Sequence, residues 1–145
     1  MTTSRRSEAL AASLYIPLGT LETVARLDVA FDGADEVTPE LDLTKGLGGA
    51  LLRERVVAHV AARFVVLVTP DKKVATLGTR APIPIEVVPF AATVVARELE
   101  VLGGRPSRRL LSGEPYLSDN GNPILDTHFG PIGDPRRLDA AIRSI

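Results

Sequence analysis

The sequence predicts an α/β protein with two lobes, a partial Rossmann-like parallel sheet followed by a ferredoxin-like α+β lobe. Three observations support this fold class. A strand, a helix and a second strand follow one another between residues 27 and 68, as in a βαβ unit. The pattern changes at the breaker-rich segment 78–82, and beyond it the order is β-α-β-β-α. We therefore expect a catalytic lobe over residues 1–78 and a second lobe over residues 79–145.

The first lobe is predicted to contain two helices and two strands. Residues 5–14 have helical composition and end before an Ile-Pro-Leu-Gly breaker cluster. Residues 27–31 form a short apolar run closed by Asp-Gly, which indicates a buried strand. Residues 49–62 favour a helix whose apolar stripe recurs at every fourth position over 52–60. Residues 64–68 are apolar and β-branched, which is typical of a strand covered on both faces.

The second lobe is predicted as strand 83–88, helix 90–102, strands 108–111 and 123–127, and helix 135–145. A ferredoxin-like unit has one more strand after this order, so we expect its last strand to be missing. The first lobe similarly supplies only two clear parallel strands, which is fewer than a stable open sheet normally has. The pattern therefore indicates the interior of a larger protein.

Composition excludes several classes of function. The hydrophobic fraction of 45% and the charged fraction of 24% are those of a soluble globular protein. A net charge of −1 supplies no basic field for nucleic acid and no polybasic patch for a membrane surface. The chain has no cysteine, and its two histidines, His59 and His128, are far apart, which argues against a metal site. No signal core or membrane-length apolar run is visible, so we expect a cytoplasmic protein.

A carboxylate-rich turn follows the first predicted strand, in the order Asp32, Gly33, Ala34, Asp35 and Glu36. One interpretation is a solvated turn in which Asp and Gly satisfy the backbone geometry. However, three neighbouring carboxylates raise one another's cost of ionisation, so they make sense chiefly when a cation or substrate hydroxyls lie opposite. Lys45 is an available cation.

A glycine turn (Gly46, Leu47, Gly48 and Gly49) directly precedes the predicted helix 49–62. Glycines let the backbone aim its N–H groups at a ligand, and the helix N-terminus adds positive potential. The turn therefore predicts an anion or oxyanion site, although glycines at this position could also form only a flexible connection. It is not a P-loop, because no lysine and Ser/Thr pair follows the glycines.

Glu54 is the candidate general base. On a helical wheel it lies beside Val57 and Ala61, at the edge of the apolar arc. Partial desolvation there raises the pKa of a carboxyl group toward the range useful for proton abstraction. The alternative is a solvated glutamate paired with Arg53 or Arg55.

Lys72 follows the end of the second predicted strand, after Thr69, Pro70 and Asp71. The carboxyl ends of parallel strands share one edge of a sheet, so Lys72 and Asp32 are expected at the same edge. A bound phosphate would favour a lysine there, while the alternative is an ordinary surface lysine.

Four blocks of sequence together resemble ribose-5-phosphate isomerase of the A type, in order and in spacing, over essentially all 145 residues. They are residues 32–36, 43–54, 84–89 and 119–126. The resemblance implies interconversion of ribose 5-phosphate and ribulose 5-phosphate in the non-oxidative pentose phosphate pathway. It also implies no metal or organic cofactor, no nucleic-acid or membrane partner, and a homodimer.

The resemblance also implies roles for individual residues. Glu54 matches the base that moves a proton between C2 and C1 through a cis-enediolate, and Asp32 matches the acid that assists opening of the furanose ring. Asp35 and Lys45 match residues that bind sugar hydroxyls and stabilise the oxyanion. The implied substrate-binding set is Asp32, Gly33, Ala34, Asp35, Lys45, Gly46, Leu47, Gly48 and Lys72.

The sequence departs from the family pattern in three respects. Leu47 stands where many members have glycine, and residues 69–71 replace a more usual Asp-x-Ser. Members of the family begin with a strand and a Gly-x-Gly-Thr-Gly-Ser-Thr loop that helps to hold the phosphate, and they end with further strands. We therefore expect a chain truncated at both ends, without the phosphate loop. The alternative function is a non-catalytic sugar-phosphate-binding or interaction fragment.

Overall fold

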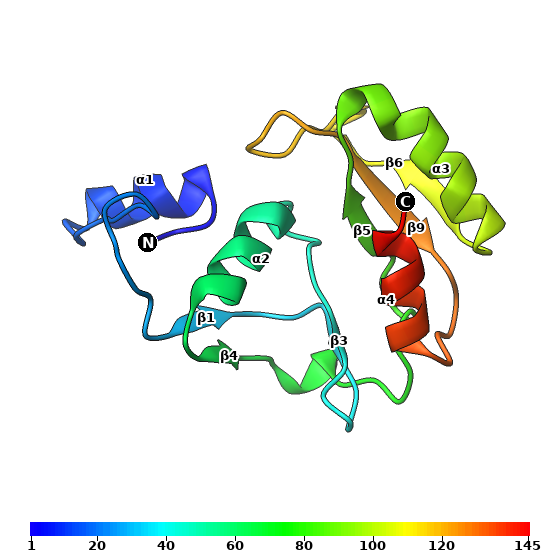
Figure 1. Ribbon diagram of the computed structural model, residues 1–145, viewed down its shortest axis with the longest axis horizontal. Coiled ribbons are helices and arrows are strands. Elements are labelled where there is room, and N and C mark those ends of the chain that lie inside the picture. Colours follow the sequence, from blue (N-terminus) through cyan, green and yellow to red (C-terminus); the bar gives the residue numbers. More distant parts are fainter.

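The computed structural model describes residues 1–145. The first half of the chain contains α1 (Arg5–Ser13), β1 (Ala30–Asp32), β2 (Glu36–Val37), β3 (Leu43–Thr44), α2 (Leu51–Val60), β4 (Phe64–Val66) and the 3-10 helix η1 (Pro70–Lys72). The second half contains β5 (Ile83–Glu86), the 3-10 helix η2 (Pro89–Ala91), α3 (Ala92–Val101), β6 (Arg105–Arg108), β7 (Leu110–Leu111), β8 (Glu114–Pro115), β9 (Ile124–His128) and α4 (Pro135–Arg143). Figure 1 shows α1, α2, β1 and β4 beside the group formed by β5, β9, β6, α3 and α4. None of the helices has the length and apolar character needed to cross a bilayer.

β1 and β4 form a parallel pair connected through α2, so the first half contains the predicted βαβ unit. Ala30 lies opposite Phe64, and Asp32 lies opposite Val66. The α/β fold class is therefore confirmed. α2 packs against β1 and also against β5, so this helix lies between the two sheets.

The predicted apolar stripe of α2 is wrong. Leu52, Val56 and Val60 are 45%, 38% and 44% exposed, and no residue of α2 is fully buried. The inner side of the helix instead carries Glu54 and Ala58, which line a cavity against β5. The reason is that one side of α2 faces both sheets, while Leu52 and Val56 on its other side border an open cavity beneath the N-terminal segment that contains α1.

The strands β1 and β4 are not buried on both faces, which also corrects the sequence prediction. Phe31 and Leu67 are each 65% exposed, and Phe64 is 39% exposed. α2 covers one face of this two-stranded sheet, and the other face has no covering layer in the chain (Figure 1). An apolar run thus correctly indicated strands but did not determine their burial.

The second sheet has the strand order β5-β9-β6, with β9 antiparallel to both neighbours. β5 and β6 are therefore parallel to each other, and α3 makes the connection between them, as in a split βαβ unit. This arrangement confirms the predicted β-α-β-β-α order. Leu99 of α3 is fully buried and packs with Val87 and Leu125.

The strand predicted at 108–111 lies elsewhere. The strand that pairs with β9 is β6, in which Arg105 lies opposite His128. Residues 110–111 instead form β7, which pairs with β8 in a short hairpin. β6 has the polar sequence Arg-Pro-Ser-Arg because it is an edge strand, where proline and exposed side chains are tolerated. An apolar pattern therefore could not reveal it.

Glu36 connects the first half of the chain to the segment 78–81. This side chain is fully buried, and its carboxylate accepts hydrogen bonds from the backbone N–H groups of Gly78 (2.5 Å), Arg80 (2.6 Å) and Ala81 (3.2 Å). Three donors satisfy a charge that would otherwise be costly to bury. Glu36 therefore belongs to the structural support of the acidic turn and does not face a ligand.

Candidate active site

A short hairpin assembles the site. β2 pairs with β3 in antiparallel register, with Glu36 opposite Thr44, and the N–H group of Asp35 donates to the carbonyl of Thr44 at 2.8 Å. Lys45 follows directly after β3, so the hairpin brings it back to the acidic turn at the carboxyl end of β1. The sequence pattern did not predict this hairpin, because each strand has only two residues.

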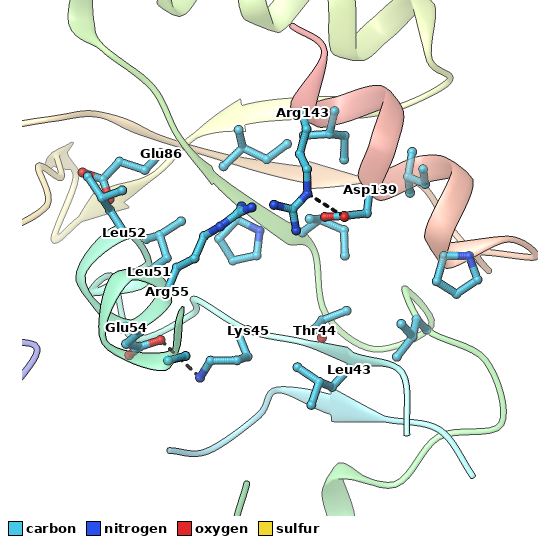
Figure 2. A pocket seen from close by; sticks show the side chains of 18 of the residues that line it. Leu43, Thr44, Lys45, Leu51, Leu52, Glu54, Arg55, Glu86, Asp139 and Arg143 are labelled. Carbon is cyan, nitrogen blue, oxygen red and sulfur yellow. Dashed lines mark hydrogen bonds and ion pairs between the residues drawn. The ribbon is translucent and has the colours of Figure 1, made fainter. Parts of the chain in front are cut away.

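Lys45 lies between two carboxylates. Its Nζ is 2.6 Å from Oδ2 of Asp32 and 3.3 Å from Oε2 of Glu54, and it donates to the carbonyl of Gly33 at 2.7 Å. The three charged side chains are only 15–22% exposed. Figure 2 shows the side chains of Glu54 and Lys45 pointing toward one another beside α2. Residues that are 13 and 9 positions apart from Lys45 in the sequence thus form one compact cluster.

The acidic turn is held by its own backbone. Oδ1 of Asp32 accepts the N–H group of Gly33 at 2.7 Å, while its other oxygen contacts Lys45. Oδ2 of Asp35 accepts the N–H group of Leu47 at 3.0 Å, which joins the acidic turn to the glycine turn. Ala34 adds no polar side chain, so it can offer a ligand only its backbone.

The glycine turn is closed by a hydrogen bond from the N–H group of Gly49 to the carbonyl of Gly46 at 3.0 Å. Gly46 is buried with φ +108°, and a Cβ there would lie 3.1 Å from the Cβ of Leu51, so this position requires glycine. Gly48 is exposed, and its N–H group has no acceptor within the chain. That N–H group is therefore free to bind an anionic oxygen.

Burial raises the pKa of Glu54 above its ordinary value of 4.5. The positive charge of Lys45 opposes this shift, whereas the negative charge of Asp32 reinforces it. Glu54 also lies in the wall of a mainly apolar cavity of about 460 Å³ between α2, β5 and α4 (Figure 2). A carboxylate with a raised pKa is a stronger base for a carbon-bound proton.

The raised pKa of Glu54 predicts a dependence of stability on pH. Because folding favours the protonated carboxyl group, this contribution to stability is complete below pH 4.5 and is lost as the pH rises through the raised value. We therefore expect the Glu54→Gln variant to unfold at an equal or higher temperature than the wild type at neutral pH. Thermal unfolding followed by circular dichroism should show the difference narrowing in acid. A variant that is less stable only at neutral pH would contradict this expectation.

The alternative partners of Glu54 are engaged elsewhere or make no ion pair with it. Nε of Arg53 donates to Oδ1 of Asn120 at 3.0 Å, and no ion pair joins Arg55 to Glu54. Asn120 also donates to Glu86 at 3.0 Å. Burial acts to raise the pKa of Glu86, but hydrogen bonds from Ser118, Asn120 and Asn122 outweigh it, so the pKa is lowered. The turn 118–122 therefore anchors the first turn of α2 through Arg53.

Lys72 lies apart from the cluster. It ends η1, its side chain is 41% exposed, and its Nζ is 4.0 Å from Oδ2 of Asp71. No hydrogen bond or ion pair joins Lys72 to Asp32, Lys45 or Glu54. The structure thus brings the other charged candidates together and leaves Lys72 outside their network.

Sequence reasoning missed Arg109, which forms hydrogen bonds with the glycine turn. Nη1 of Arg109 donates to the carbonyls of Leu47 at 2.9 Å and Gly46 at 3.4 Å. No sequence signal distinguishes Arg109 from the adjacent Arg108, because the contact joins segments more than 60 residues apart.

The fold and this geometry define a class of protein: an α/β protein in which carboxylates, a lysine and a glycine turn gather at the carboxyl end of its parallel strands, where proteins of this class bind their ligands. The family described as ribose 5-phosphate isomerase A (phosphoriboisomerase A) matches residues 1–145. The chain belongs to this family.

Individual relatives agree with this membership. The chain is 54% identical over 144 residues to ribose-5-phosphate isomerase A of Roseiflexus sp. (strain RS-1). The matched region covers 99% of this chain and 62% of that protein. A solved structure of ribose 5-phosphate isomerase A from Methanocaldococcus jannaschii matches with TM-score 0.91 and 42% identity, over 99% of this chain and 64% of that one. A solved structure of D-ribose-5-phosphate isomerase in complex with phospho-erythronic acid matches with TM-score 0.92 and 39% identity, over 99% of this chain and 63% of that one. The chain therefore spans less than two thirds of the length of these relatives.

Proposed function

We propose that this chain carries the reactive centre of an aldose–ketose isomerase that interconverts ribose 5-phosphate and ribulose 5-phosphate. The observation that supports this most directly is the contact of Lys45 with both Glu54 and Asp32, at 3.3 and 2.6 Å. It combines a largely buried base with a fixed cation, and membership of the isomerase family supports the choice of substrate. A non-catalytic binding fragment would not need a base with a raised pKa at this position.

In the proposed reaction the carboxylate of Glu54 takes the proton from C2 of the open-chain aldose. The electron pair forms the C1–C2 double bond, and the carbonyl oxygen becomes the enediolate oxyanion. A proton then passes from the C2 hydroxyl to this oxygen, and Glu54 returns its proton to C1. Lys45 and the N–H group of Gly48 stabilise the negative charge as it develops. The steps balance by proton transfer alone, so they require no metal or organic cofactor.

The remaining residues of the proposal bind or prepare the substrate. Asp32 assists opening of the furanose ring, and Asp35 receives a sugar hydroxyl beside its contact with Leu47. The backbone of Gly33, Ala34, Gly46, Leu47 and Gly48 lines this side of the sugar. The polar acidic turn suits the hydroxyl groups better than the mainly apolar cavity on the other side of Glu54. Lys72 contributes positive charge for the phosphate at the same edge of the sheet.

Turnover of ribose 5-phosphate in D₂O tests the proposed function. We expect deuterium at C1 of the ribulose 5-phosphate formed, because the proton on Glu54 exchanges with solvent between its removal and its return. Proton NMR of the product measures this incorporation. Absence of conversion would contradict the isomerase function, and conversion without deuterium at C1 would contradict the exchange of the Glu54 proton with solvent.

We further propose that the protein acts in the pentose phosphate pathway of the cytoplasm as a homodimer. Exposed apolar side chains at and before α3 support association, since Phe90 is fully exposed and Val101 is 80% exposed. We also propose that residues 1–78 form the catalytic lobe, and that residues 79–145 form a second lobe which supports it.

A further inference from the structure

We propose that Arg109 is a positioning residue that orients the glycine turn toward the substrate. This inference rests on the proposed isomerase function and adds a residue of the second lobe to its machinery. Arg109 does not contact Lys45 or Glu54. It acts on the two carbonyl groups of Gly46 and Leu47, on the side of the turn opposite the acidic residues.

The guanidinium group of Arg109 is itself firmly oriented. Its Nε and Nη2 donate to the two carboxylate oxygens of Asp126 at 2.8 and 2.5 Å, and the ring centre of Tyr116 lies 5.7 Å away. The Arg109 and Asp126 side chains are only 12% and 19% exposed. A paired arrangement of this kind fixes the plane of the guanidinium, which leaves Nη1 aimed at the glycine turn.

The backbone of Arg109 is equally fixed. Its N–H group donates to the carbonyl of Ile124 at 2.8 Å, and its own carbonyl accepts from the N–H group of Tyr116 at 3.0 Å. The residue is thus anchored to the β5-β9-β6 sheet and to the β7–β8 hairpin. The guanidinium group therefore holds the glycine turn in a fixed position relative to the second sheet.

The directions of the first two peptide bonds in the turn follow from this contact. In a trans peptide the C=O and N–H groups point to opposite sides. The carbonyl of Gly46 faces Arg109, and the N–H group of Leu47 on the same peptide donates to Asp35 on the other side. The carbonyl of Leu47 also faces Arg109, so the N–H group of Gly48 points away from it and remains without an acceptor in the chain.

Without Arg109 the peptide between Leu47 and Gly48 would lose its main constraint. Glycine accepts both signs of φ, so a flip of this peptide meets little steric resistance at Gly48, where an added Cβ would contact nothing within 4 Å. The flipped peptide would present a carbonyl oxygen to the developing oxyanion and repel it. The effect of losing Arg109 is therefore expected in the chemical step more than in substrate binding.

Replacement of Arg109 by alanine, compared with Arg108→Ala, tests the inference. Arg108 is exposed and makes no contact with the turn, so it provides a matched control. We expect Arg109→Ala to lower kcat for ribose 5-phosphate by about tenfold to a hundredfold, with KM changed by less than about threefold. Added guanidinium ion, well below denaturing concentrations, should restore part of kcat in Arg109→Ala alone. Arg109→Lys keeps the positive charge but loses the planar guanidinium that binds Asp126 and the turn at the same time, so it should lower kcat in the same way.

Several outcomes would overturn the inference. They are a kcat of Arg109→Ala within about twofold of the wild type, an equal loss in Arg108→Ala, or a loss confined to KM. If the wild-type chain converts no ribose 5-phosphate, the proposed isomerase function is contradicted. The positioning role of Arg109 is then tested by the backbone amide NMR signals of Leu47 and Gly48. They should shift in Arg109→Ala or Arg109→Lys and stay in place in Arg108→Ala. Unchanged signals in the Arg109 variants would overturn the positioning role.

Discussion

Replacement of Glu54 by glutamine is expected to lower kcat for ribose 5-phosphate by about 10³-fold to 10⁴-fold, the upper range for the loss of a general base. The amide keeps the size of the side chain and can still contact Lys45, so we expect KM to change little. Initial rates of ribulose 5-phosphate formation measure the effect. Because Gln removes a charge that is costly to bury, the loss of activity should occur without loss of folding.

No neighbouring carboxylate is placed to replace Glu54. Asp32 is held by Lys45 and by the N–H group of Gly33, and Asp35 is held by the N–H group of Leu47. Glu98→Gln, the same change at an exposed position of α3, is the matched control and should retain full activity. A Glu54→Gln variant with activity comparable to that control would remove Glu54 from the proposed mechanism.

Replacement of Glu36 by alanine is expected to lower the free energy of unfolding by about 3 kcal/mol or more, because three backbone N–H groups lose their acceptor. Denaturation by urea, monitored by circular dichroism, measures this loss. Glu36→Gln should be less damaging, since its remaining carbonyl oxygen can still accept hydrogen bonds from some of these donors.

Glu40 provides the control for this experiment. It lies four residues further along the same hairpin, and it is exposed. Glu40→Ala should therefore change the free energy of unfolding by no more than about 0.5 kcal/mol. Equal stability of the Glu36→Ala and Glu40→Ala variants would show that the buried carboxylate does not hold residues 78–81.

Local patterns were sufficient for much of the fold. The apolar runs at 27–31 and 64–68, with a helix between them, predicted the parallel pair β1–β4, because a crossover of this kind joins parallel strands. The glycine turn was correctly placed before α2, since turn residues and helix starts are properties of neighbouring residues. The same locality explains the errors at β6 and at the two-residue strands β2 and β3, which lack an apolar pattern.

The sequence by itself determined the order of the elements, the family and the residue types available for proton transfer. Only the tertiary structure decided that Lys45 contacts both Asp32 and Glu54, and that Leu52 on the same helix is exposed. It also decided that Arg109, rather than Arg108, reaches the glycine turn. The physical reason is that periodicity and turn preference depend on neighbouring residues, whereas burial and ion pairing depend on which distant segments pack together. Identical residue types in one short stretch can therefore have entirely different environments.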